Sequence, residues 1–150
     1  GSGRTATGPR MLATRSRLYP DTEEVMGWNI GTTGFQIKLS NEVANVAEKY
    51  LGEDVRDFLK DHDLTPADIS TWVCHPGGPK VIEAVEHTLD LPADAMDYTR
   101  KSLRENANLS SVSVLDVLRA NMADAPPPGS YGLMMAMGPG FCSELVLLGW

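Results

Sequence analysis

The stretch Trp72–Lys80, with the sequence WVCHPGGPK, constrains the fold of this chain more than any other. Its apolar run predicts a short buried strand that ends at His75. The Pro-Gly-Gly-Pro that follows predicts a tight turn with little backbone freedom, and Pro79 suits the first turn of a helix. The sequence therefore predicts a strand, a turn and a helix that hold an imidazole at a strand end, where folds often place functional residues.

Two further segments predict a polar and a glycine-rich connection, each at the start of a helix or the end of a strand. Glu105–Ser111 (ENANLSS) is a polar cluster that opens a helix, and Met137–Gly140 (MGPG) is a glycine-rich turn. Together with the histidine they offer an imidazole, a carboxamide and an adaptable backbone. Such groups at strand ends and helix starts are typical of a functional site.

Composition limits the classes of protein that fit. A length of 150 residues with 42% apolar residues suits one domain with a core. The net charge of -7 and the lack of a Lys/Arg block argue against a nucleic-acid partner, and no apolar run is long enough for a membrane span. Cys74 and Cys142 do not form a disulfide framework, so we expect a reduced, cytoplasmic protein. We expect residues 1–10 to be a linker or the cut end of a longer chain.

The hydrophobic patterns predict a layered α/β fold, a mixed sheet with helices on both faces. We expect strands over 11–19, 35–39, 71–75, 131–137 and 143–148, the last two forming an antiparallel pair covered on both faces. We expect residues 21–34 to be turns. Helices are predicted from Ser40 or Asn41 to Gly52, from about 55 to 62, over 79–89, in part of 92–103, and from Ser110 or Ser111.

His75 and Asn108 are the candidate catalytic residues. A neutral imidazole can donate or accept a hydrogen bond near working pH, and a carboxamide donates two without ionising. Paired, they could form an oxyanion hole for an enolate or thioester oxygen. The alternatives are a buried histidine that satisfies a backbone group and an asparagine that caps a helix. Asn106 competes with Asn108 for the role.

Neither cysteine is in a convincing nucleophile position. Strand alternation predicts that Cys74 points away from the face that displays His75, as a buried apolar residue. Cys142 begins a strand and has no base beside it in the sequence. No Cys/His spacing predicts a metal site and no phosphate-binding loop is present, so we expect no metal. Gly138-Pro139-Gly140 is either a simple tight turn or a loop that lets backbone approach a substrate.

These motifs resemble the C-terminal half of a type III polyketide synthase, the chalcone synthase-like branch of the thiolase superfamily. His75–Pro79 matches the histidine motif of that family, Asn108–Ser111 its asparagine motif and Gly138–Gly140 its C-terminal loop. The resemblance runs from about residue 11 to 150. The flanking sequences SLRE (102–105) and VSVLD (112–116) resemble bacterial members more than plant ones.

The resemblance implies a thiolase-like fold and a mechanism. A cysteine takes an acyl starter from its CoA thioester, and His75 and Asn108 polarise the thioester carbonyl of malonyl-CoA for decarboxylation. The family's cysteine lies in an N-terminal half that this chain lacks, so we expect that half as a partner. The family also implies a homodimer and no cofactor beyond the CoA substrates. Alone, this half would expose the apolar surface meant for the other.

Other family positions fall on named residues of this chain. Ile37 lies where plant members keep a phenylalanine that gates the cavity, and Trp28 and Ser110 lie at positions that line it. Lys80 lies near the expected CoA entrance, where it could meet phosphate, although a solvated lysine at a helix start is an equal alternative. Trp28 could equally be a loop aromatic packed on the core.

Two departures from the family pattern affect the site. Ala107 replaces the usual glycine before Asn108, and a positive φ there would strain alanine by roughly 1–2 kcal/mol. Ala136-Met137 replaces the usual Gly-Phe before the glycine-rich loop. Two alternatives stay open: a ketoacyl-carrier-protein synthase III-like enzyme, whose histidine motif usually continues differently, and a truncated, non-catalytic scaffold or dimer partner. The starter group, the number of extensions and the cyclisation mode are not predicted.

Overall fold

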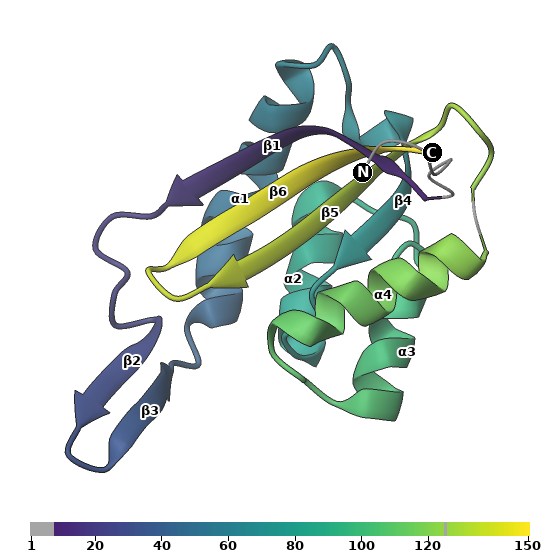
Figure 1. Cartoon of the computed structure of the whole chain (residues 1–150). Coiled ribbons are helices and arrows are strands. Elements are labelled where there is room, and N and C mark those ends of the chain that lie inside the picture. The colour runs from purple at the N-terminus through teal and green to yellow at the C-terminus, as the bar shows by residue number, and fades with distance from the viewer. Residues whose placement is uncertain (1–7, 125) are drawn as a thin grey trace, which may run out of the picture.

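The computed structural model describes residues 8–124 and 126–150, and its centre is a mixed four-stranded sheet (Figure 1). The strand order is β1-β6-β5-β4, in which β4 and β5 are parallel and the other pairs antiparallel. The strands are β1 (Arg10–Leu18), β4 (Ile69–Cys74), β5 (Tyr131–Gly138) and β6 (Cys142–Gly149). Most of the predicted linker, residues 1–7 of 1–10, lies outside the described residues.

Helices pack on both faces of this sheet, as the sequence predicted. On one face, α1 and α2 bury Phe58 and Val85 against Leu133 and Leu145. On the other face, α4 packs Val117 and its neighbours against β4 and β5, and Leu148 of β6 joins the same cluster. The helices are α1 (Val43–Lys60), α2 (Pro79–Leu89), α3 (Asp97–Asn106) and α4 (Ser111–Ala123), with the short 3-10 helix η1 (Pro66–Asp68) before β4.

A separate hairpin stands away from the sheet. Strands β2 (Met26–Gly31) and β3 (Gly34–Leu39) pair only with each other, and they extend beyond the main body in Figure 1. The prediction of turns over 21–34 was wrong for residues 26–31. Gly27 and Gly31 indicated turns, but both are accommodated within β2 because β3 supplies its hydrogen-bonding partner.

Helix α1 also differs from the prediction, since it runs unbroken through Gly52 where a break was expected. A Cβ at Gly52 would overlap Thr88 Oγ1 of α2 and lie 3.0 Å from the Thr88 carbonyl oxygen. The glycine therefore serves the close packing of α1 on α2 and does not end the helix. Helix α2 has the predicted limits.

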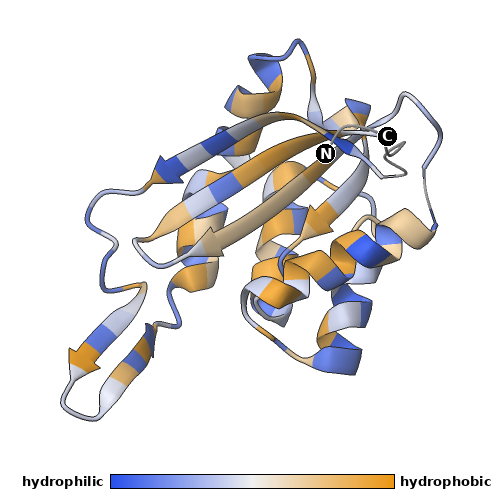
Figure 2. Cartoon of the chain, in the orientation of Figure 1, coloured by the Kyte–Doolittle hydropathy of each residue, from blue (hydrophilic) through white to orange (hydrophobic). Residues whose placement is uncertain are grey.

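The second face of the sheet is only partly covered. Helix α4 lies over β4 and β5, but Met11 and Leu18 of the edge strand β1 are 76% and 68% exposed. Glu144 of β6 is also exposed, so the predicted β5–β6 pair is fully covered on one face only. Apolar residues also lie on the surface of the hairpin, as Figure 2 shows. No helix among the described residues is long and apolar enough to cross a membrane.

Candidate active site

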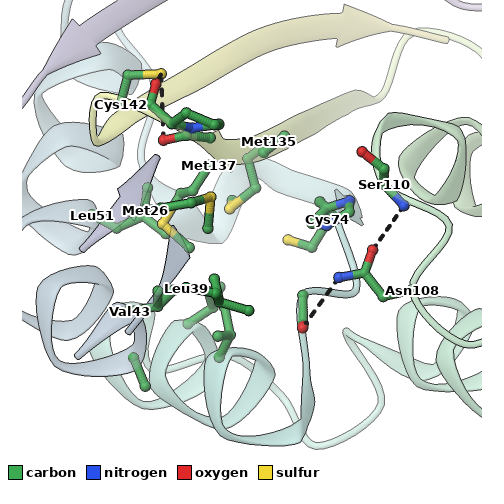
Figure 3. Close-up of a pocket in the computed structure, with 18 of the residues that line it drawn as sticks. Met26, Leu39, Val43, Leu51, Cys74, Asn108, Ser110, Met135, Met137 and Cys142 are labelled. Carbon is green, nitrogen blue, oxygen red and sulfur yellow. Dashed lines mark hydrogen bonds between the residues drawn. The ribbon is translucent and has the colours of Figure 1, made fainter. Parts of the chain in front are cut away.

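A cavity of about 610 Å³ opens where the ends of β4 and β5 meet the hairpin and the first turns of α1, α2 and α4. Figure 3 shows its polar side, with Asn108 and Ser110, opposite an apolar side with Met26, Leu39 and Val43. Every residue predicted for the site lines this cavity except Gly140. The site is therefore made from segments far apart in the chain.

His75 follows directly after the last residue of β4. Its backbone N–H donates to the Met135 carbonyl at 2.9 Å, which extends the parallel pairing with β5 by one residue. The Gly77 N–H then donates to the His75 carbonyl at 2.9 Å and closes the turn into α2. The half-buried imidazole has its pKa lowered by burial, so the neutral form predominates at pH 7.

Asn108 lies in the short connection between α3 and α4. Its side-chain oxygen accepts the Ser110 N–H at 2.9 Å, and its amide nitrogen donates to the Gly77 carbonyl at 3.4 Å. The second bond ties the asparagine loop to the histidine loop, so both residues face one cavity. Asn106 instead donates to Asp116 at 3.0 Å and does not line the cavity, which favours Asn108 for the role.

The residues on either side of Asn108 have unusual backbones. Ala107 and Ser110 both have φ of 58°, with ψ of -161° and -141°. Only glycine adopts this region without strain. Ala107 therefore has the positive φ at which an alanine is strained, and it precedes Asn108 in the short connection between α3 and α4.

Trp28 and Ile37 contribute the hairpin side of the cavity. They are direct partners in the β2–β3 pairing and are 52% and 59% exposed, so they stand at the rim. Lys80 lines the cavity from the first turn of α2. Gly140 lies behind the wall, where its N–H donates to the Met26 carbonyl at 3.2 Å. Its neighbours Gly138 and Pro139 line the cavity.

The apolar side of the cavity was predicted only at Trp28, Ile37 and Ala136-Met137. It is rich in sulfur, since Met26, Met96, Met135 and Met137 all line it. Methionine side chains are flexible and polarizable, which suits a wall that meets apolar or aromatic ligands. The alternation of β5 could have indicated Met135 and Met137, because they share a face with the buried Leu133 at the strand's C-terminal end.

Both cysteines also line the cavity, but as thiols. Burial raises the pKa of Cys74, and partial burial together with Glu144 raises the pKa of Cys142. Cys74 is buried, as predicted, and it lines the same cavity as His75, which lies past the strand end. No cluster of metal-ligating side chains occurs in residues 8–124 and 126–150.

The family described as chalcone and stilbene synthases, C-terminal domain, matches residues 10–149. The chain belongs to this family. The 1,3,6,8-tetrahydroxynaphthalene synthase of Streptomyces peucetius subsp. caesius is 50% identical over 151 residues, which cover 99% of this chain and 40% of that protein. A putative chalcone synthase of Bacillus subtilis (strain 168) is 35% identical over 143 residues, covering 95% of this chain and 39% of that protein.

Solved structures show that the chain has the fold of a chalcone synthase-like C-terminal half. The 1,3,6,8-tetrahydroxynaphthalene synthase of Streptomyces coelicolor A3(2), described as a bacterial type III polyketide synthase, superposes with a TM-score of 0.91 at 29% identity. That match covers 98% of this chain and 42% of the other. PKS-I of the brown alga Ectocarpus siliculosus gives a TM-score of 0.85 at 26% identity, over 99% and 41% of the two chains. This chalcone synthase-like chain therefore spans about two fifths of the length of these relatives.

Proposed function

We propose that this chain supplies the decarboxylation site of a type III polyketide synthase that condenses an acyl-CoA starter with malonyl-CoA. The observation that carries the proposal is the joining of His75 and Asn108 at one cavity through the Gly77 carbonyl, in a chain 50% identical to a tetrahydroxynaphthalene synthase. Their roles come from the family resemblance, and the geometry is compatible with them.

The proposed chemistry uses hydrogen-bond donors and no metal. A neutral His75 N–H and the Asn108 amide donate to the thioester carbonyl oxygen of the malonyl group. The bond to the carboxylate breaks, CO₂ leaves, and its electron pair forms an enolate whose oxygen both donors stabilise. The enolate carbon then attacks the acyl thioester on a cysteine, and the thiolate leaves. The family resemblance places that cysteine in the N-terminal half, and burial, which raises the pKa of both Cys74 and Cys142, argues against either as the nucleophile.

The environment of His75 supports its role as a donor. Because burial lowers its pKa, the imidazole keeps one N–H and one free lone pair at pH 7. We propose that the same ring, when it accepts the proton of the catalytic cysteine thiol, also pairs as an imidazolium with the resulting thiolate. Lys80, on the first turn of α2 at the cavity wall, is proposed to meet a CoA phosphate.

The proposal includes a homodimer and a cytoplasmic location, and both rest on the family resemblance. It also includes the N-terminal half of the family as the part that completes the cavity. The first product to assay is 1,3,6,8-tetrahydroxynaphthalene, because the relative that is 50% identical to this chain is named as a synthase of that compound.

The complete polypeptide that carries this chain should be incubated with malonyl-CoA, with and without acyl-CoA starters, and its products identified by mass spectrometry. Aromatic polyketides made from CoA thioesters would support the proposal. Condensation only with malonyl thioesters of acyl carrier protein would favour a ketoacyl synthase III-like enzyme. A lack of any condensation or decarboxylation would favour a scaffold and overturn the proposal.

A further inference from the structure

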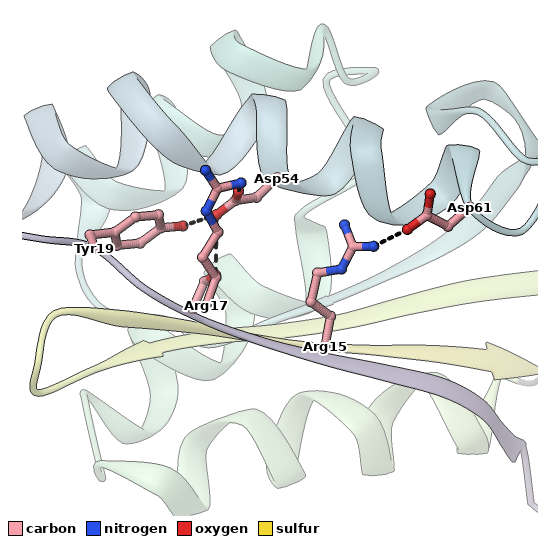
Figure 4. Close-up of polar contacts among 6 residues, drawn as sticks. Arg15, Arg17, Tyr19, Asp54 and Asp61 are labelled. Carbon is pink, nitrogen blue, oxygen red and sulfur yellow. Dashed lines mark hydrogen bonds and ion pairs between the residues drawn. The ribbon is translucent and has the colours of Figure 1, made fainter.

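Asp54 is a buried carboxylate in the middle of α1, close to the end of β1. Its side chain is 1% exposed and accepts hydrogen bonds from the Tyr19 hydroxyl and the Arg17 guanidinium (Figure 4). The Ser143 hydroxyl of β6 lies 3.4 Å from the same carboxylate oxygen that Tyr19 contacts. Burying a carboxylate is costly unless it is paired and hydrogen-bonded, so these partners account for its presence in the core.

Tyr19 connects Asp54 to the loop formed by residues 138–142. Its backbone N–H donates to the Phe141 carbonyl at 2.9 Å, and its ring lies 6.0 Å from the Phe141 ring. Thr22 closes the link, since its hydroxyl donates to the Tyr19 carbonyl at 2.7 Å and accepts the Phe141 N–H at 3.0 Å. Burial and the Asp54 carboxylate both raise the pKa of Tyr19, so the phenol keeps the proton that it donates.

The loop held in this way forms one wall of the candidate active site. Gly138, Pro139 and Cys142 line the cavity, whereas Phe141 is fully buried behind them. The Gly140 N–H also donates to the Met26 carbonyl, which links the loop to the first residue of the hairpin. A shift of the loop would therefore change the width of the cavity at both Pro139 and Met26.

We propose that Asp54 is a positioning residue that acts through Tyr19 to fix residues 138–142, and so sets the shape of the cavity and the products released from it. Asp54 contacts neither His75 nor Asn108. It is connected to the loop through Tyr19. The effect on products rests on the proposed function, whereas the effect on the loop does not.

A second ion pair between β1 and α1 provides a matched control. Arg15 of β1 pairs with Asp61, which follows directly after α1, is 63% exposed and lies at the end of that helix far from the loop (Figure 4). The test compares Asp54→Ala, Asp54→Asn and Tyr19→Phe with Asp61→Ala in the complete polypeptide. Two quantities are measured: amide hydrogen exchange of residues 138–143, and the ratio of products from malonyl-CoA.

We expect Asp54→Ala and Tyr19→Phe to raise exchange at residues 138–143 by about tenfold, equivalent to about 1.4 kcal/mol, and to alter the product ratio. Asp54→Asn should keep both the exchange rate and the product ratio closer to those of the unsubstituted protein, because its amide oxygen can still accept a hydrogen bond from the Tyr19 hydroxyl. Asp61→Ala should change neither. If Asp54→Ala does not fold, Tyr19→Phe decides the question.

Two results would overturn the inference. One is unchanged exchange at residues 138–143 in Tyr19→Phe, and the other is an unchanged product ratio despite faster exchange. An unsubstituted polypeptide that makes no product would contradict the proposed function instead, and the exchange measurement would still test the anchoring of the loop.

Discussion

Ala107 adopts φ of 58° and ψ of -161°, a conformation in which its Cβ is crowded by its own backbone. The cost is of the order of 1–3 kcal/mol, and the structure accepts it at the residue that precedes Asn108. From the sequence the strain could be stated only as conditional on a positive φ, since the family resemblance implies a glycine at this position. What could not be predicted is that Ser110, on the other side of Asn108, shares the same φ.

Ala107→Gly should stabilise the protein. The strain released, about 1–3 kcal/mol, exceeds the extra unfolded-state entropy of glycine, about 0.5–1 kcal/mol, so we expect a net gain of about 1 kcal/mol. Urea denaturation measures the change. Ala120→Gly in the helical interior of α4 is the control and should lose about 1 kcal/mol. Equal losses in both variants would show that Ala107 is not strained.

His75 should make stability depend on pH. Because burial lowers its folded pKa below the ordinary value of 6.5, the unfolded chain binds a proton more readily than the folded one. The contribution of His75 to the free energy of unfolding is constant above pH 6.5, the ordinary pKa. This stability is lost as the pH falls from 6.5 towards the lower pKa of the folded protein. His75→Gln should remove this part of the pH dependence, as measured by urea denaturation between pH 5 and pH 8. The same slope in both proteins would contradict a buried neutral imidazole.

At the scale of elements, local signals predicted most helices and strands. Pro79 and the preceding turn predicted the start of α2, and two apolar runs joined by a glycine-rich turn predicted β5 and β6. The predictions were wrong where contacts with distant segments determine the local structure. Gly52 was interpreted as a helix end because nothing local reveals Thr88 packed against it, and β2 was missed because its glycines resemble a turn until β3 pairs with it.

Gly52→Ala should disturb the packing of α1 against α2 and lower the stability of the protein. The new methyl group would overlap Thr88 Oγ1 and press on the Thr88 carbonyl, and overpacking of this kind costs about 1–3 kcal/mol. Gly31→Ala in the hairpin meets no atom within 4 Å and should change stability by no more than about 0.5 kcal/mol. Thermal denaturation compares the two. A stability change at Gly52 as small as at Gly31 would mean that the helices do not pack this closely.

At the scale of the whole molecule, the chain exposes apolar surface on its hairpin and on β1. Ile30 and Phe35 are 76% and 72% exposed, and Met11 is equally accessible. Patches of this kind mark interaction surfaces. The family resemblance predicted such a surface, but only the structure shows that the hairpin contributes to it.

The 150-residue chain alone should therefore self-associate and bind an apolar fluorescent dye more strongly than the complete polypeptide does. Ile30→Ser together with Phe35→Ser should lower both the dye binding and the association, measured by sedimentation. Replacement of the exposed polar Asn29 and Gln36 of the same strands with serine is the control. A monomeric chain with no dye binding would show that these residues form no interaction surface.

The sequence predicted the polar side of the candidate site better than the apolar side. His75, Asn108 and the glycine-rich loop follow short motifs, and each motif keeps its residues within a few positions of one another. The sulfur-rich wall could not be predicted as a unit, because Met26, Met96 and Met135 come from distant segments and meet only through the packing of the sheet and helices.

Asn108, with His75, is proposed to promote decarboxylation of malonyl-CoA. The most direct test is the rate of CO₂ release from malonyl-CoA by the complete polypeptide, comparing Asn108→Ala with Asn106→Ala. Loss of one oxyanion donor should reduce the rate about 10²–10³-fold in Asn108→Ala. Asn106→Ala should leave the rate close to that of the unsubstituted protein, since Asn106 bonds to Asp116 outside the cavity. An unchanged rate in Asn108→Ala, or an equal loss in both variants, would contradict the account.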